Sequence, residues 1–396
     1  MGRLRHLTAG ESHGPCLVGI LDGLPRGIPV SRQAIESLLR RRRAGFGRSA
    51  RQKKEQDCFH LLGGVDQDKT TGNPFCIQIE NSLPEGTDMP AQEVQPARGK
   101  RDRGLTCPRP GHADFVGALK WNEADFRDVA ERASARETAV LTALSVPPRA
   151  LLASLGVQSL ALVARLGPIS TRIPAGTSWK ELARAVEENG AEWLSPSADV
   201  IAEWRELVKT ASASGDSLGG SVQIRVRGVI PGLGGFSQRD TRLDGRLAGV
   251  LMALPGVKAV EIGSAFLASI SRGSLAADEL RFSNRSGVRR TRNLGGGLEG
   301  GMANGEDLEI QLLMKPIPTV AGRMSFSLKT RQPAMAECPR HDTVALAALA
   351  VAAESAVAIE LAGAYLEQFG GATLEDTKAA WNAYAKRIKP LWRPRT

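Results

Sequence analysis

The stretch at residues 344–364 reads VALAALAVAAESAVAIELAGA and is the longest run rich in alanine, leucine and valine in the sequence. It is uncharged only as far as Ala353, because Glu354 and Glu360 follow. A membrane span needs about 20 apolar residues in succession, so this run is too short and too charged to cross a bilayer. Its composition indicates a helix buried in the core of a protein.

We expect this helix to begin near Thr343, with Asp342 as its cap, and to stop at Gly370 and Gly371, because glycine commonly ends helices. Apolar spacing also predicts a helix over residues 31–43, and alternating apolar and polar residues predict strands over residues 75–80, 222–227 and 309–314. Helices and strands are mixed without a Pro/Ser linker or a regular βαβ rhythm. The sequence therefore predicts an α+β fold in a single large domain over residues 1–396, with a basic C-terminal tail at about 386–396.

The composition is that of an ordinary globular protein, and the net charge is strongly positive. The 396 residues include 52 Lys and Arg against 42 Asp and Glu, which gives a formal charge of +10. That charge suits nucleic acid, an anionic membrane surface or a small, multiply charged anion as the partner. The N-terminal residues lack the apolar centre of a secretion signal, and the five cysteines contain no CxxC motif, which argues against a disulfide scaffold or a zinc ribbon. We therefore expect a reduced, cytoplasmic protein.

Three of the five histidines lie in turn-like sequences beside charged residues. His13 lies in GESHG (residues 10–14), His112 in RPGHAD (109–114) and His341 in RHD (340–342). An imidazole in such a setting is suited to acid and base chemistry near neutral pH, although a plain surface loop explains each one equally well when it is taken singly. His6 and His60 have no such context, and we interpret them as structural.

Arginine is concentrated in two segments. The first combines the RRRR run at residues 40–43 with Arg48 and Arg51, and the second, which leads into His112, contains Arg98, Arg101, Arg103 and Arg109. Arginine is suited to bidentate contacts with carboxylates and phosphates, so both segments are candidate anion sites. The alternative for the first segment is a solvated basic face.

Two further segments favour ligand binding, each with a plainer alternative. SARE at residues 134–137 predicts a capping box in which Ser134 starts a helix that ends before Pro147. Arg132 and Arg136 flank that helix start, where anions bind readily, although an ordinary cap has the same sequence. The stretch at residues 293–301 contains GxGxxG, but it lacks the strand before and the helix after that dinucleotide binding requires.

The sequence contains no P-loop, no HExxH motif and no acidic cluster, so it gives no support for a metal site. The turn histidines, arginine-rich loops and glycine-rich loop together indicate a site for one or two strongly anionic ligands with proton transfer. Chemistry on a phosphorylated or carboxylated small molecule would need this set of residues. The reaction itself does not follow from the residue types.

Nine segments resemble the chorismate synthase family, in the family's order and over nearly the whole chain. They are GESHG (10–14), RRRRAGFGR (40–48), RPGHAD (109–114), RASARETA (132–139), SGDSLGG (214–220), VKAVEIG (257–263), GGLEGGMANG (296–305), KPIPT (315–319) and RHD (340–342). The resemblance implies a β-α-β sandwich, usually assembled as a homotetramer. It also implies conversion of 5-enolpyruvylshikimate 3-phosphate to chorismate and phosphate, by a 1,4-anti elimination that requires reduced FMN without net redox change.

The resemblance further implies roles for individual residues. His13 falls on the position that serves the leaving phosphate, His112 on the position that protonates or hydrogen-bonds the reduced flavin, and Asp342 on the position that assists proton transfer at the flavin N5. The substrate-binding positions fall on Arg42, Arg48, Arg51, Arg109, Arg136 and Arg340. The flavin-binding positions fall on Ser134, Ala135, Arg136, Pro255, Gly256, Gly300, Lys315, Pro316, Ile317, Pro318, Thr319 and Arg340.

The sequence departs from the family pattern at three places. RSARQKKE (48–55) replaces the more usual RGGRMKIE, Pro255 and Gly256 replace a small or amide pair, and residues 343–345 lack the cysteine or proline often found there. An inactive homologue of the same fold is therefore one alternative. A basic nucleic-acid-binding protein is another, although the arginine runs lack the interleaved aromatic residues that stack on single strands. The flavin reductant is either external or linked to NADPH, and no membrane partner is expected.

Overall fold

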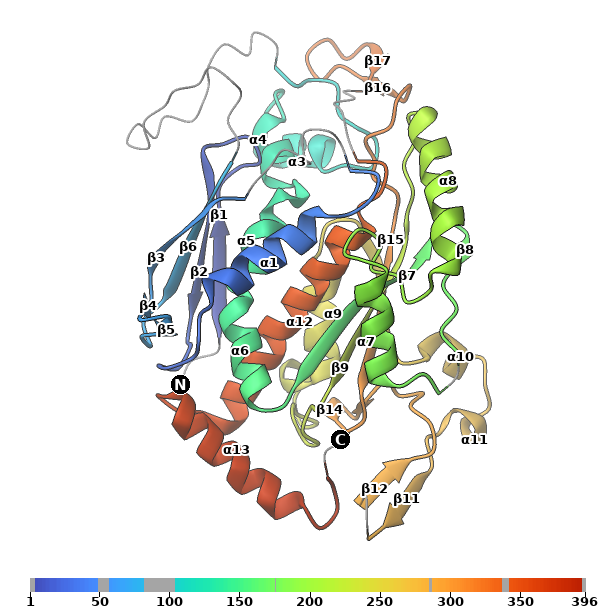
Figure 1. Ribbon diagram of the computed structural model, residues 1–396. Helices are drawn as coiled ribbons and strands as arrows, with labels where there is room; N and C mark the ends of the chain where they lie inside the picture. The colour runs from blue at the N-terminus through green and yellow to red at the C-terminus, as the bar shows by residue number, and fades with distance from the viewer. Residues whose placement is uncertain are drawn as a thin grey trace.

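The computed structural model describes residues 4–48, 57–81, 104–174, 176–284, 287–336 and 342–393. Two antiparallel β-sheets lie on either side of a layer of helices, as Figure 1 shows. This arrangement confirms the α+β fold, and the β-α-β sandwich that the family resemblance implies.

The first sheet has the strand order β1-β2-β6-β3. Its strands are β1 (Arg5–Ala9), β2 (Cys16–Asp22), β6 (Phe75–Glu80) and β3 (Phe59–Gly63). Along β6 the side chains of Phe75, Ile77 and Ile79 are fully buried, and the side chains between them face the other side of the sheet. The predicted strand at residues 75–80 is therefore confirmed at both ends.

The second sheet has the strand order β10-β15-β9-β7-β8. Its strands are β10 (Val257–Ile262), β15 (Leu308–Met314), β9 (Gly220–Arg227), β7 (Gln158–Leu166) and β8 (Ile169–Ser170). Ile224 of β9 pairs with Ile310 of β15, and both are fully buried. The strands predicted at residues 222–227 and 309–314 are confirmed, and the structure starts them two residues and one residue earlier.

The helices between the sheets are α1 (Arg32–Arg43), α5 (Thr138–Leu144), α6 (Val146–Ser154), α9 (Leu243–Met252) and α12 (Leu346–Phe369). The prediction of a helix over residues 31–43 is confirmed, with Ser31 as the cap whose hydroxyl accepts a hydrogen bond from the Ala34 N–H. Of the helices in the described part of the chain, only α12 is long and apolar enough to be a candidate membrane span, but 89% of its apolar window is buried. It is the central core helix that its sequence predicts.

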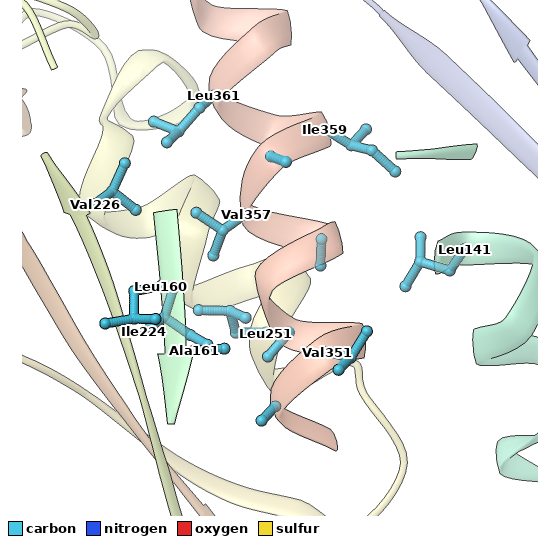
Figure 2. Close-up of a cluster of buried hydrophobic side chains, with 14 of the residues drawn as sticks. Leu141, Leu160, Ala161, Ile224, Val226, Leu251, Val351, Val357, Ile359 and Leu361 are labelled. Carbon is cyan, nitrogen blue, oxygen red and sulfur yellow. The ribbon is translucent and has the colours of Figure 1, made fainter. Parts of the chain in front are cut away.

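Helix α12 packs directly on β7 and β9 of the second sheet, and α5, which packs beside it, contacts β2 and β6 of the first sheet. In Figure 2, Val357 points toward β7 and β9, whereas Ile359 lies on the side of α5, which carries Leu141. The helix ends before Gly370, as expected, but it begins at Leu346 rather than near Thr343. Asp342 does not cap it, because its carboxylate pairs with Arg48 instead.

The capping box predicted at residues 134–137 is half formed: Ser134 caps the segment as predicted, but Glu137 does not complete the box. The Ser134 hydroxyl accepts a hydrogen bond from the Arg136 N–H (3.3 Å), and the Glu137 carboxylate accepts one from the Thr8 hydroxyl of β1 (3.1 Å). The segment is a 3₁₀ turn (Ala135–Glu137) that leads into α5. Helix α5 ends at Leu144, before Pro147 as predicted, and Pro147 lies in the first turn of α6, where proline is favoured.

The smaller elements lie around this sandwich. They are β4 (Val65–Asp66), β5 (Lys69–Thr70), α3 (Asp114–Trp121), α4 (Arg127–Arg132), α7 (Trp179–Glu188), α8 (Asp199–Ala213), α10 (Ala265–Ser269), α11 (Gly273–Ala276), β11 (Leu280–Ser283), β12 (Gly287–Arg290), β13 (Leu298–Glu299), β14 (Met302–Ala303), β16 (Met324–Phe326), β17 (Pro333–Met335) and α13 (Leu374–Ile388). In the view of Figure 1, α3, α4, β16 and β17 lie at the upper end of the molecule, and β11, β12, β14 and α13 lie at the lower end.

Candidate functional site

Two predicted site segments meet at the upper end of the molecule: residues 109–114, here called the 109–114 loop, and residues 315–319, here called the 315–319 segment. The Lys315 Nζ donates a hydrogen bond to the Gly111 carbonyl (2.5 Å), and the Arg109 Nη1 lies 3.5 Å from the Thr319 hydroxyl. The Lys315 N–H also donates to the Gly256 carbonyl (3.0 Å) in the turn between α9 and β10. The structure thus brings together segments that are about 200 residues apart in sequence.

Lys315 lies in a basic environment. Burial and the charge of the neighbouring Lys258 lower the pKa of its ammonium group. Among the residues that the structure describes, no carboxylate forms an ion pair with Lys315. Lys315, held by the Gly111 carbonyl rather than by an acid, and the neighbouring positive charge of Lys258 make a favourable place for an anionic ligand.

The backbone that supports the 315–319 segment is closely packed. The Ser217 hydroxyl donates to the Ile317 carbonyl (2.6 Å). A Cβ atom at Gly219 would lie 2.5 Å from the Met314 carbonyl oxygen and 2.9 Å from the Pro316 nitrogen, so only glycine fits there. Residues 217–219 therefore hold the segment in its position.

His112 is held by the side chain of Asp114. The His112 Nδ1 lies 2.5 Å from the Asp114 Oδ1, and Arg109 donates to both carboxylate oxygens, from Nε (2.7 Å) and from Nη2 (2.9 Å). The Asp114 side chain is completely buried. Burial alone would raise the pKa of Asp114, but the hydrogen bonds from Arg109 and His112 outweigh it and hold that pKa well below its usual value.

His13 has a similar partner from a distant part of the chain. The Glu131 Oε2 accepts hydrogen bonds from the Ser12 hydroxyl (2.5 Å) and the His13 N–H (2.8 Å), and it lies 2.8 Å from the His13 Nδ1. Burial alone would raise the pKa of Glu131, but the hydrogen bonds from His13 and Ser12 outweigh it and lower that pKa to about 2. Glu131 is therefore an anion that fixes the loop carrying His13.

The arginines of α1 and of the 135–137 turn are built into the protein interior. Arg136 donates to Asn81 Oδ1 (2.9 Å), to the Glu80 carbonyl (3.2 Å) and to the buried carboxylate of Asp57. Arg42 donates from Nε to the Thr138 hydroxyl (3.0 Å) and from Nη2 to the carbonyl of Ala135 (3.2 Å). These contacts join α1, the first sheet and the 135–137 turn, which places Arg42, Arg136, Ser134 and Ala135 together. The substrate-binding role of Arg42 and Arg136 stays a prediction.

Arg48 and Asp342 form a buried ion pair. The Arg48 Nε lies 3.1 Å from the Asp342 Oδ2, and both side chains are about 5% exposed. The adjacent Thr343 donates from its N–H to the Gly47 carbonyl and accepts at its own carbonyl from the N–H of Leu218, both at 2.9 Å. Asp342 is thus connected through residues 217–219 to the 315–319 segment. Arg51, Arg340 and His341 lie outside the described residues.

Gly300 lies away from these groups. It is in the turn between β13 and β14. The Gly301 carbonyl of this turn accepts a hydrogen bond from the N–H of Leu243, at the start of α9. Pro255 and Gly256 lie near the opposite end of α9. The seven residues of β15 separate this hairpin from Lys315, a span of about 20 Å at roughly 3.3 Å per residue. Within one copy of the chain, Gly300 does not join the other predicted site residues.

The structure also identifies residues that the sequence did not single out. Asp114 lies only two residues from His112, and a carboxylate at that spacing in a turn can be recognised in the sequence. Glu131 and Asp57 cannot be recognised in this way, because each contacts a residue far away in sequence. Glu131 is 118 residues from His13, and Asp57 is 79 residues from Arg136. Gly219 lies in a glycine-containing motif, but its close approach to the 315–319 segment is visible only in the structure.

Comparisons with known proteins agree on one family. The description of the matching family is "Chorismate synthase", and the match covers residues 4–366. Similar proteins named chorismate synthase occur in Desulforudis audaxviator, at 43% identity over 98% of each chain, and in Thermus thermophilus, at 40% identity over 98% of this chain and 100% of that protein. A solved structure described as a crystal structure of chorismate synthase matches with a TM-score of 0.78 and 32% identity, covering 98% of this chain and 99% of that one. The chain belongs to the chorismate synthase family.

Proposed function

We propose that this chain catalyses the family reaction at the site formed by His13, the 109–114 loop, the 315–319 segment and the Arg48–Asp342 pair. The reaction is that of a carbon-oxygen lyase in the shikimate pathway and supplies chorismate for aromatic amino acid biosynthesis. 5-Enolpyruvylshikimate 3-phosphate loses its C3 phosphate and a C6 proton in a 1,4-anti elimination, giving chorismate and phosphate. The reaction needs reduced FMN, although no net oxidation or reduction occurs.

The observation that carries the proposal is the meeting of the 109–114 loop with the 315–319 segment through Lys315 and Gly111. This contact places a carboxylate-bound histidine beside a lysine whose pKa is lowered by burial and by Lys258. A proton-transfer group beside a cationic cradle is what the removal of phosphate from an anionic substrate requires.

The residues present fit a reduced FMN. The donors around the 315–319 segment are an ammonium group, a guanidinium group and the Thr319 hydroxyl, which suit a phosphorylated group with a polar ring. Gly256 adopts a positive φ of 83° beside Lys315, which keeps side-chain atoms out of this turn. In the proposed site Ser134, Ala135, Arg136, Pro255, Gly256, Gly300, Lys315, Pro316, Ile317, Pro318, Thr319 and Arg340 hold the cofactor. Bound there, reduced FMN supplies electron density while the phosphate leaves.

The chain's own groups bind the substrate and handle protons. Arg42, Arg48, Arg51, Arg109, Arg136 and Arg340 supply positive charge for the phosphate and two carboxylates of the substrate. His13 donates to the leaving phosphate. His112 hydrogen-bonds the reduced cofactor, and Asp342, fixed by Arg48, assists removal of the proton.

A homotetramer is part of the proposal, as is a single domain over residues 1–396. Gly300 is separated from Lys315 by the length of β15, so its flavin-binding role requires a second copy of the chain to present it. Sedimentation velocity on the purified protein tests this assembly, and a monomer with full flavin affinity would contradict it. The packing of α12 between both sheets supports the single domain. We further propose a cytoplasmic location and a reductant that is either external or NADPH-linked.

The decisive experiment is anaerobic turnover of the purified protein with 5-enolpyruvylshikimate 3-phosphate. We expect phosphate and chorismate in equal amounts with pre-reduced FMN, and comparison with an arm containing oxidised FMN and NADPH shows whether the chain reduces its own flavin. Flavin titration by absorbance, run alongside, separates an active enzyme from an inactive homologue. Bound flavin without any product would contradict the proposal, and salt-sensitive retention of an oligonucleotide would favour the nucleic-acid alternative.

Gly219→Ala is expected to weaken FMN binding by roughly tenfold to a hundredfold while the protein stays folded. The added methyl group collides with the backbone at Met314 and Pro316, so the 315–319 segment must move. Overpacking of this kind costs about 1–3 kcal/mol. Flavin titration measures the effect, and Gly249→Ala on the exposed side of α9, where a Cβ meets nothing within 4 Å, is the matched control. Equal affinities in the two variants would contradict the role of Gly219.

A further inference from the structure

We infer that Asp114 is a positioning residue that holds His112 with its proton on Nδ1 and directs its Nε2 to the ligand. The contact between the His112 Nδ1 and the Asp114 Oδ1, together with the double contact from Arg109, carries the inference. The inference rests on the proposed function, because that function makes His112 the group that contacts the reduced cofactor.

The contact at 2.5 Å requires a proton between the two atoms. A carboxylate has only acceptors, and a nitrogen without hydrogen facing it at this distance would place two lone pairs against each other. The Nδ1 must therefore carry the hydrogen and donate it to Asp114. The Arg109 Nη2 also lies 3.1 Å from Nδ1, but a guanidinium can only donate, so its hydrogen goes to the Asp114 Oδ1 at 2.9 Å.

Asp114 is fixed as an anion by its surroundings. Its side chain is fully buried, and its Oδ2 accepts from both the backbone N–H (3.0 Å) and the Nε (2.7 Å) of Arg109. Its Oδ1 accepts from the Arg109 Nη2 and from His112. Each carboxylate oxygen thus accepts two hydrogen bonds from the 109–114 loop. The carboxylate therefore orients the imidazole without taking its proton.

The other imidazole nitrogen is the one that reacts. Among the described residues, none forms a hydrogen bond with the His112 Nε2. In the neutral ring Nε2 is an acceptor, and in the protonated ring it is a donor, so His112 exchanges its proton with a ligand only at this atom. Asp114 thereby sets both the direction of the ring and the nitrogen that acts.

Asp114→Asn is the variant that tests the tautomer. The amide oxygen is expected to take the Oδ2 place, where two Arg109 donors point, so the amide NH₂ takes the Oδ1 place and donates to the His112 Nδ1. The hydrogen of the neutral ring then moves to Nε2. The ring stays bound to residue 114, although the Arg109 Nη2 loses the acceptor that it has at the Oδ1 place. The nitrogen that faces the ligand changes from acceptor to donor.

Nitrogen-15 NMR of the ring nitrogens measures this change directly, because the chain has only five histidines. His112→Gln identifies the His112 signals. In the neutral wild-type protein we expect an N–H signal for Nδ1 and a bare-nitrogen signal for Nε2, with the reverse in Asp114→Asn. A wild-type protein with its hydrogen on Nε2 would overturn the inference even if the variant fails to fold.

Turnover completes the test. Asp114→Asn is expected to lower kcat by about 10²-fold with little change in KM. Glu360→Gln, which removes the negative charge that Arg246 contacts at 2.5 Å outside the proposed site, is the control and is expected to keep normal turnover. A reversed tautomer with normal kcat would overturn the positioning role. Absence of turnover in the wild-type protein would defeat the proposed function instead, while the NMR result still decides the tautomer.

Discussion

Replacement of His112 by Ala is expected to lower kcat by about 10²–10⁴-fold, and His13→Ala is expected to cause a loss of the same order. Both histidines are fixed through Nδ1 by an anionic carboxylate, Asp114 in one case and Glu131 in the other. A group held in this way contributes proton transfer in a defined direction, and alanine removes it completely. Phosphate release from 5-enolpyruvylshikimate 3-phosphate, measured anaerobically with pre-reduced FMN, gives the size of each effect.

His60→Ala is the control for these two variants. His60 also pairs with a carboxylate, Glu80 (2.6 Å), but both side chains are half exposed and lie outside the proposed site. It is expected to keep normal turnover. The circular dichroism spectra of all three variants should match that of the wild-type protein, because the two site histidines lie in loops rather than in the core. Near-normal turnover in both His13→Ala and His112→Ala would remove the roles proposed for them.

The elements that the sequence predicts correctly are those whose signal is local. Helix α12 follows from its own apolar run, and strand β6 follows from alternation within six residues. The errors arise where a side chain that the local sequence predicts to cap a helix interacts with a residue far away in sequence instead. Glu137 accepts from Thr8 on the first sheet instead of completing a capping box, and Asp342 pairs with Arg48 instead of capping α12.

The same distinction applies to the site. The histidines, arginines and the KPIPT segment are visible in the sequence because their residue types and motifs are distinctive. The carboxylates that fix them are not visible, because Glu131 reaches His13 only through the approach of α4 to the loop between β1 and β2. The separation of Gly300 from Lys315 likewise follows from the direction of β15, which no motif encodes.

Glu354→Ala is expected to lower the free energy of unfolding at neutral pH by about 3–5 kcal/mol, the usual cost of breaking a buried ion pair by removing one partner. Glu354 lies inside α12 with only 2% of its side chain exposed. It accepts hydrogen bonds from the Arg41 Nη1 (3.0 Å) and the Ser159 hydroxyl (2.8 Å), and the Arg149 Nη1 lies 3.3 Å away. Alanine would leave two cations in the interior without an anion. Urea unfolding measures the loss.

Two further variants separate charge from packing. Glu354→Gln keeps the shape and the hydrogen-bond acceptor, so its loss is expected to be smaller than that of alanine. Glu188→Ala removes an exposed partner of Arg184 on α7, and its loss is expected to be negligible beside that of Glu354→Ala, because exposed pairs contribute little. Equal losses of stability in Glu354→Ala and Glu188→Ala would mean that the buried ion pairs of Glu354 contribute no more than an exposed pair.

The effect of Glu354 should also depend on pH in a defined direction. Burial alone would raise the pKa of this carboxyl, but Arg149 and Arg41 outweigh it and lower the pKa to about 2, from an ordinary value of 4.5. A group whose pKa is lower in the folded state stabilises the protein above its ordinary pKa, and that contribution falls as the pH drops from 4.5 toward 2. The difference in stability between the wild-type protein and Glu354→Ala should therefore be largest at neutral pH and smaller at about pH 3. A difference that stays constant over this range would show that the variant loses packing alone, and not the ion pairs that attach α1 and α6 to the core helix.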